Sequence, residues 1–196
     1  MNRIWIACLL LVMLAACSEK MITDKITKKS IAEVSQGSNT IVNPLSDAMD
    51  QGNHEYTKNV VVDVSYYKTQ SVVRGDIVYY GDNNVARVIA FPNEKMKITS
   101  GQIYINEGKL DTFYGSAHIR GYDYLKFKDT NGDEPAKQNL INEIFKKNQN
   151  EITLKNDEVF VIGDDWSRSN PATTFRKLST KEILGKVMGI CTKCRQ

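Results

Sequence analysis

The chain has 196 residues, of which 26 are lysine or arginine and 23 are aspartate or glutamate, so its formal net charge is +3. Charges of both signs are interspersed along the chain, which argues against nucleic acid as the main partner. A chain of this length is long enough to bury one hydrophobic core and to carry an insertion.

The N-terminal residues have the organisation of a bacterial lipoprotein signal. Arg3 precedes an almost unbroken apolar run over residues 4–14, which is shorter than the roughly 20 residues that a membrane-spanning helix needs. Two alanines then lead to Cys17, as in a lipobox, where the cysteine is acylated and becomes the mature N-terminus. We predict a signal peptide over 1–16 and a lipid on Cys17 that holds the chain on the bacterial cell envelope, facing the periplasm or the cell exterior. The alternative is an ordinary signal peptide or a short uncleaved anchor.

Two further cysteines, Cys191 and Cys194, form a CxxC motif near the C-terminus. Tetrahedral zinc needs four ligands, and both histidines lie far from this pair in the sequence. A thioredoxin-like pair would lie at the start of a helix, whereas this pair lies on a C-terminal tail. Outside the cytoplasm, a small-loop disulfide or two surface thiols is the default. The sequence indicates no metal site and no cofactor.

The remaining chain divides by composition. Residues 17–59 are polar and without a sustained period, which predicts a tether between lipid and domain. Short β-branched or alternating runs, separated by turn residues, then predict strands. These runs cover residues 60–64, 77–80, 85–91, 95–98, 102–106, 158–162 and 186–190.

One helix is predicted at about residues 134–148, where apolar residues recur on one face. The preceding loop, 129–133, lacks the glycine and glutamate that a calcium-binding EF-hand loop needs, so it is interpreted as a surface turn leading into the helix. Ser179 and Glu182 have the spacing of a capping box at a helix start. The expected fold is mainly β (α+β), a β-barrel or complex β fold of short strands. It comprises a domain over 60–190, an inserted cap segment over 111–157 with the helix, and a tail over 191–196.

Five segments together resemble the type I signal peptidase (leader peptidase) family, in order and in spacing. They are RGDIV at 74–78, RVIAFP at 87–92, GQIYIN at 101–106, FVIGDD at 160–165 and EILGKV at 182–187. The resemblance covers about 85 residues, and the helical segment would occupy the variable cap of the family. It implies a signal-peptidase-like β fold outside the cytoplasm.

The resemblance also implies a serine endopeptidase that cuts exported proteins with a Ser–Lys dyad. A serine hydroxyl is a poor nucleophile, so a lysine kept neutral by apolar neighbours takes its proton. In the family this lysine directly precedes the segment matched by RVIAFP, and here that position holds Ala86. Alanine has no titratable group, and Arg87 keeps its proton at ordinary pH.

The family's nucleophile position is altered as well. Alignment on residues 42–44 puts Ile41 where the serine belongs, and Ser38 and Ser46 are nearby alternatives. The last block retains Gly163, Asp164 and Ser169, while residues 171–173 stand where the family has an Asp-Ser-Arg triplet. The departures therefore cluster at catalytic positions, while the scaffold positions are kept.

Three functions are compatible with this pattern. The first is a catalytically degenerate lipoprotein that binds extended peptides or assists the assembly of exported proteins, because a strand-flanked cleft can hold a peptide by edge pairing without hydrolysis. The second is an active serine protease with a relocated dyad, for example Ser38 or Ser46 with Lys58 or Lys95 as base. The third is a structural envelope lipoprotein. Fold alone does not decide between them, since function depends on the site.

Overall fold

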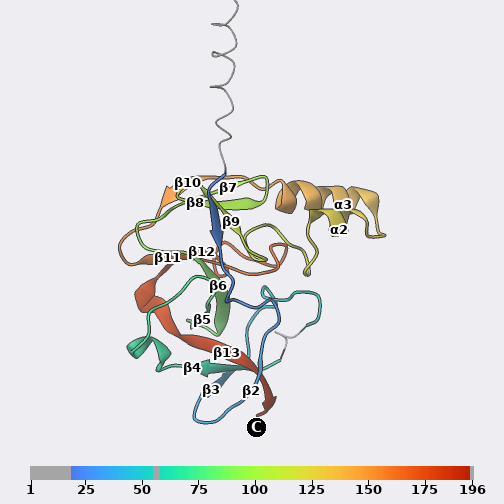
Figure 1. Ribbon diagram of the computed structural model, residues 1–196. Helices are drawn as coiled ribbons and strands as arrows, with labels where there is room; N and C mark the ends of the chain where they lie inside the picture. The colour runs from blue at the N-terminus through green and yellow to red at the C-terminus, as the bar shows by residue number, and fades with distance from the viewer. Residues whose placement is uncertain (1–18, 55–57, 195–196) are drawn as a thin grey trace, which may run out of the picture.

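A computed structural model describes residues 19–54 and 58–194, and its strands form two open sheets (Figure 1). The mainly β fold class is confirmed, whereas the barrel alternative is not what the strands form. The predicted signal peptide and Cys17 lie outside the described residues.

Sheet A has five strands in the order β1-β9-β8-β7-β10. The strands β7, β8 and β9 form an antiparallel meander, β10 pairs antiparallel with β7, and β1 pairs parallel with β9. The bounds are β1 Met21–Thr23, β7 Lys95–Thr99, β8 Gln102–Ile105, β9 Gly108–Asp111 and β10 Gln149–Thr153.

Sheet B has eight strands, seven of them in the order β12-β11-β6-β5-β13-β4-β3, while β2 pairs parallel with the end of β13. Its long strand β13 reaches three neighbours because it passes β5, β4 and β2 in turn. The bounds are β2 Glu33–Ser35, β3 Thr40–Val42, β4 Val60–Asp63, β5 Ile77–Tyr80, β6 Asn84–Ala90, β11 Glu158–Ile162, β12 Phe175–Ser179 and β13 Ile183–Lys193.

The helical segments lie between β9 and β10. The α-helix α2 (Tyr124–Lys128) precedes α3 (Glu134–Leu140), which continues as a π-helical turn, η3 (Ile141–Phe145). Asp133 caps α3 by accepting a hydrogen bond from the Ala136 N–H, as expected for a surface turn leading into a helix. Two 3₁₀ turns, η2 (Tyr66–Lys68) and η4 (Thr180–Glu182), complete the elements, and both hydrogen bonds of the predicted capping box are present at η4.

The structure differs from the expected organisation in three places. Strands β1, β2 and β3 lie in the segment predicted to be a tether, and β13 continues through Cys191 into the predicted tail. The predicted insertion contributes β10 to sheet A, and it contains α2 as well as the predicted helix. The three early strands are only three residues long, which is too short for a run of apolar alternation that the sequence could show.

Buried apolar side chains form three clusters. The largest lies under sheet A and extends to the helical segment, with Ile98, Ile103, Ile141, Phe145 and Trp166 among its members. The other two involve sheet B, one including Val42, Val60 and Val187 and the other including Val78, Ala86 and Val161. The five family-like segments thus supply strands on which all three clusters are built.

Candidate functional site

Ala86, at the family's lysine position, lies in the central strand β6 and pairs with Val78 of β5. It is fully buried, and its cluster contains Val78, Val88, Val161 and Leu178. Apolar surroundings are those that would keep a lysine neutral, but a methyl group has no proton to exchange. The side chain at this position of β6 therefore supplies no base.

The candidate nucleophiles lie on or beside β3, at the edge of sheet B. Ile41 is half-buried in β3 and pairs with Val61. Ser38 is exposed in the turn before this strand, and Ser46 is half-buried in the loop after it. Ser38 and Ser46 thus flank in sequence a strand whose central residue, at the aligned position, is apolar.

The structure does not bring the alternative lysines to these serines. Lys58 is exposed before β4, and Lys95 belongs to the other sheet, where its ammonium lies 3.4 Å from the Glu151 carboxylate. Within residues 19–54 and 58–194, no hydrogen bond links Ser38 or Ser46 to a lysine. The geometry therefore contains no assembled relocated dyad among these four residues.

The retained last block is tied to the rest of the scaffold by a buried ion pair. The guanidinium of Arg87 donates to Asp164 from Nε to Oδ1 at 2.7 Å and from Nη2 to Oδ2 at 2.6 Å. Arg87 also donates to the Gly75 carbonyl at 2.7 Å, and Gln51 donates to Asp164 at 2.7 Å. The ring of Phe113 lies 5.0 Å from the guanidinium carbon. Three of the family-like segments are thus joined at one buried guanidinium.

Gly163 allows two other segments to approach this block. A Cβ on Gly163 would lie 2.6 Å from the Ala48 carbonyl oxygen and would also collide with the Ser169 hydroxyl. The Ser169 hydroxyl donates to the Asp165 carbonyl at 2.9 Å. The loop after β11 and the segment around Ala48 therefore close over Gly163, which follows directly on the β11 strand paired with β6.

Sequence reasoning missed an acidic cluster beside the last block. Asp50 and Asp165 are fully buried, and among the described residues no hydrogen bond to the Oδ2 atom of either is found, although the His54 Nδ1 atom lies 3.2 Å from Asp50 Oδ2. Arg168 lies between them, 3.8 Å from Asp50 and 3.6 Å from Asp165, and it also pairs with Asp47. Burial, together with the nearby Asp50 carboxylate, raises the pKa of Asp165. No spacing in the sequence indicates this cluster, because Asp47 and Asp50 belong to a polar loop far from residue 165.

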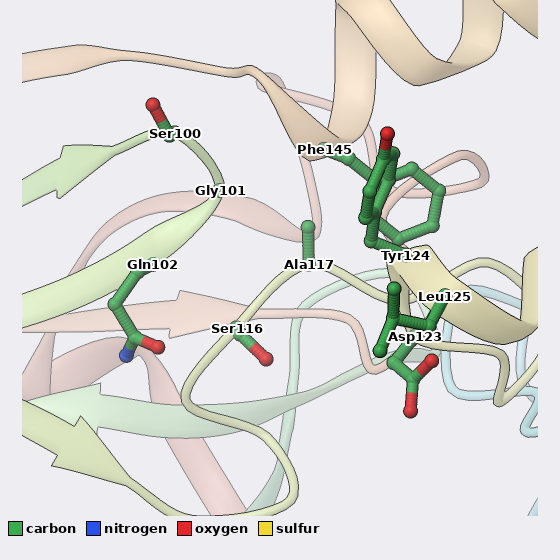
Figure 2. A pocket seen from close by; sticks show the side chains of 9 residues that line it. All are labelled: Ser100, Gly101, Gln102, Ser116, Ala117, Asp123, Tyr124, Leu125 and Phe145. Atoms are coloured by element: carbon green, nitrogen blue, oxygen red, sulfur yellow. The ribbon is translucent and has the colours of Figure 1, made fainter. Parts of the chain in front are cut away.

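Two of the cavities that border the helical segment differ in their lining residues. One, of about 360 Å³, is lined by residues of the last block and of the helical segment, including Ser169, Trp166, Phe175, Ile144 and Lys147. The other, of about 260 Å³, lies between the β7–β8 turn and α2. Figure 2 shows the rings of Tyr124 and Phe145 on one side of this second cavity, across from Ser100 and Gln102. Of these two cavities, the first includes Ser169, a residue of the last family-like block.

Other site predictions have these structural positions. The sulfurs of Cys191 and Cys194 are joined in a disulfide. In the part of the chain that the structure describes, no cluster of three or more His, Cys, Asp or Glu side chains is placed to hold a metal ion. Over the same residues, no helix has the length and apolar character needed to cross a membrane.

Sequence comparisons with two Staphylococcus aureus proteins agree with the five-segment resemblance. Signal peptidase IB of Staphylococcus aureus is 24% identical over 134 residues, which cover 66% of this chain and 66% of the relative. A protein named inactive signal peptidase IA, also from S. aureus, is 22% identical over 149 residues, covering 74% of this chain and 72% of that protein. A solved structure of a signal peptidase I from Enterococcus faecalis is 20% identical and covers 60% of this chain and 97% of its own, with a TM-score of 0.41.

The curated signal peptidase IB relatives are thus matched over 66% of their own length. Members of this group are extracytoplasmic or membrane-associated proteins. Residues 4–191 match the family described as signal peptidase, peptidase S26, and the chain belongs to that family.

Proposed function

We propose that this chain is a catalytically inactive, lipid-anchored member of the signal peptidase family that binds extended segments of exported proteins without cutting them. One observation carries the proposal: the family's lysine position is Ala86, fully buried in an apolar cluster on an intact central strand. A relative from S. aureus is itself named an inactive signal peptidase, which supports a non-catalytic role within this family.

The chemical reason is the absence of a base. Removing one member of a serine protease catalytic set leaves only about 10³–10⁴-fold catalysis over water. The neighbouring Arg87 cannot substitute, since guanidinium stays protonated and this one is bound to Asp164. Ile41, at the aligned nucleophile position, has no group that can attack a carbonyl.

Peptide binding is supported by features near Ser169. The 360 Å³ cavity has the aromatic walls Trp166 and Phe175, with Ile144 and Lys147 on the helical side. Phe175 begins β12, which is an edge strand of sheet B. An extended peptide can pair with such an edge and insert a side chain into an adjacent pocket. An apolar or aromatic side chain fits these walls best.

Hydrolysis is tested on the full chain with a signal-peptide substrate and a fluorophosphonate probe. We expect neither turnover nor labelling. Turnover that disappears in Ser38→Ala or Ser46→Ala, but persists in the exposed control Ser71→Ala, would demonstrate a relocated nucleophile and end the inactive interpretation.

Peptide binding is tested by fluorescence anisotropy with labelled segments of exported proteins. Glu143→Trp, which places a bulky side chain at the 360 Å³ cavity, should weaken binding by about tenfold, equivalent to roughly 1.4 kcal/mol. Lys181→Trp, at an exposed position in η4, is the matched control. Absence of any binding would favour a structural envelope lipoprotein instead.

The anchor is tested by labelling cells with a fatty acid. The full chain should incorporate the label, and Cys17→Ser should abolish it and leave an unprocessed or freely soluble form. Undiminished labelling of Cys17→Ser would refute the lipid at this residue.

A further inference from the structure

The two faces of sheet A differ in chemistry. The inner face supplies Met96, Ile98, Ile103, Ile105 and Leu110 to the largest buried cluster. The alternate residues of the same strands point the other way, as the pleat requires, and are half or fully exposed. Their exposure makes this outer face a candidate contact surface.

One row of paired residues crosses the outer face. Lys97 of β7 pairs with Tyr104 of β8, Tyr104 pairs with Lys109 of β9, and Lys109 pairs with Met21 of β1. The Lys97 ammonium lies 5.7 Å from the centre of the Tyr104 ring, and Met21 is 55% exposed. At about 4.8 Å between neighbouring strands, the row is roughly 14 Å long. We call these four residues the sheet A row.

Charges around the sheet A row are mixed, but its two lysines carry no ion pair. Glu151 lies 3.4 Å from Lys95, and Asp111 is exposed at the β9 end of the face. Tyr104 has a raised pKa through burial and through a contact with Glu19. Among the described carboxylates, none is within ion-pair distance of Lys97 or Lys109. These two ammonium groups are therefore available to an external anion.

The short length of chain between the expected lipid on Cys17 and the sheet A row indicates which external anion the two lysines would meet. Only four residue steps separate Cys17 from Met21, the end of the sheet A row, and four extended residues span at most about 14 Å. Each interfacial layer of a bilayer is about 5–8 Å thick. Attachment of the N-terminal segment to a membrane therefore holds β1 next to the headgroups. Figure 1 shows sheet A, which includes β1, in the upper part of the molecule and the C-terminus at the bottom.

We infer that the outer face of sheet A docks on an anionic phospholipid surface, with the sheet A row as its centre. Lysine stems can lie along the interface with their ammonium groups at the phosphates, while Tyr104 and Met21 contact the headgroup boundary. This inference rests on the N-terminal membrane attachment included in the proposed function. It places the β3 edge of sheet B, which Figure 1 shows near the C-terminus, away from the bilayer.

The test compares how fast individual lysines are acetylated on a membrane and in detergent. The full chain is reconstituted in vesicles of phosphatidylcholine with 30% phosphatidylglycerol, treated with a membrane-impermeant acetylating reagent, and compared with the same chain in detergent. Lys97 and Lys109 should react about fivefold more slowly in vesicles, the factor expected for one basic side chain held at an anionic surface. The exposed Lys126 of α2 and Lys181 of η4 should react equally in both. Equal reactivity of Lys97 and Lys109 in vesicles and detergent would overturn the inference.

A second arm separates failure of this inference from failure of the anchor. Residues 19–196 are held on vesicles by an N-terminal histidine tag and a nickel-chelating lipid, so Cys17 is not needed. Protection of the two lysines should persist there and should fall when phosphatidylglycerol is omitted. Lys97→Glu with Lys109→Glu should remove the protection of neighbouring Lys95, whereas Lys126→Glu with Lys181→Glu should leave it unchanged. Docking on an anionic surface would be contradicted if Lys97 and Lys109 stayed equally protected without phosphatidylglycerol. It would also be contradicted if Lys95 stayed protected after Lys97→Glu with Lys109→Glu.

Discussion

Arg87 and Asp164 are 77 residues apart in the sequence and form a two-point ion pair in which both side chains are at most 4% exposed. Arg87 belongs to β6 and Asp164 follows β11, so the pair joins the strand that carries Ala86 to the last block of family-like sequence. The family-like scaffold is held together directly beside Ala86.

The first prediction concerns this pair. Arg87→Met leaves Asp164 buried without its cation and should destabilise the chain by about 3–5 kcal/mol. Arg87→Met with Asp164→Leu should cost clearly less than the sum of the single changes, since no charge is left unpaired. Urea denaturation followed by tryptophan fluorescence measures both.

The exposed pair Arg176–Glu182, whose atoms lie 2.6 Å apart, is the matched control. Arg176→Met should cost less than about 1 kcal/mol, because solvent screens this pair. Equal effects of the two arginine substitutions would contradict a special role for the buried pair.

The second prediction concerns Gly163. Gly163→Ala should destabilise the chain by about 2–3 kcal/mol, because the new methyl group would overlap the Ala48 carbonyl and the Ser169 hydroxyl. Gly81→Ala is the control: nothing lies within 4 Å of its Cβ position, so its effect should stay within about 1 kcal/mol. A tolerated Gly163→Ala in thermal unfolding would show that the two segments do not close over this residue.

The third prediction concerns Ala86 itself. Ala86→Lys should destabilise the chain by at least about 2 kcal/mol more than Ala86→Met, because the two side chains are of similar length but only one brings an unpaired polar group into the apolar cluster. Neither variant should hydrolyse a signal peptide, since Ile41 still lacks a nucleophile. Turnover in Ala86→Lys alone would reveal a serine that the geometry does not align.

The fourth prediction concerns pH. The pKa of Asp165 is raised, so the folded state binds its proton more tightly than the unfolded state does. Ionisation of this carboxyl therefore lowers the free energy of unfolding as the pH rises from 3.8, its pKa in the unfolded chain, through its higher pKa in the folded state. Asp165→Asn should remove this loss and stabilise the chain at pH 7 by about 1 kcal/mol, the lower end of the cost of an unsatisfied buried polar atom.

Asp63 provides a control of opposite sign. Hydrogen bonds from Ser65 lower the pKa of Asp63. The stabilisation that its carboxylate contributes to the folded state is therefore present at neutral pH and is lost as the pH falls through the folded pKa. Asp63→Asn should therefore not stabilise the chain at pH 7. Denaturation curves between pH 3 and 8 distinguish the two residues, and a destabilising Asp165→Asn would show that Arg168 already neutralises its carboxylate.

The sequence predicted many strands because their side chains alternate or are β-branched. The runs at 77–80 and 158–162 coincide with β5 and β11, and the capping box of Ser179 and Glu182 is present. These are local features, set by residues a few positions apart. The five family-like segments indicated the family for the same reason, since each is a short contiguous motif.

The contacts that bring distant segments together could be identified only from the tertiary structure. The three-residue strands β1 and β2 form because β9 and β13 offer backbone partners, which no side-chain pattern in residues 17–59 shows. Contacts between remote segments also create the joining of Gly75, Arg87 and Asp164 and the burial of Asp50 beside Asp165. The row from Lys97 to Met21 depends on the pairing of β7, β8, β9 and β1. The sequence alone determined that Ala86 is not a base. The fold determined what surrounds it, because backbone hydrogen bonding and packing act between residues that are close in space.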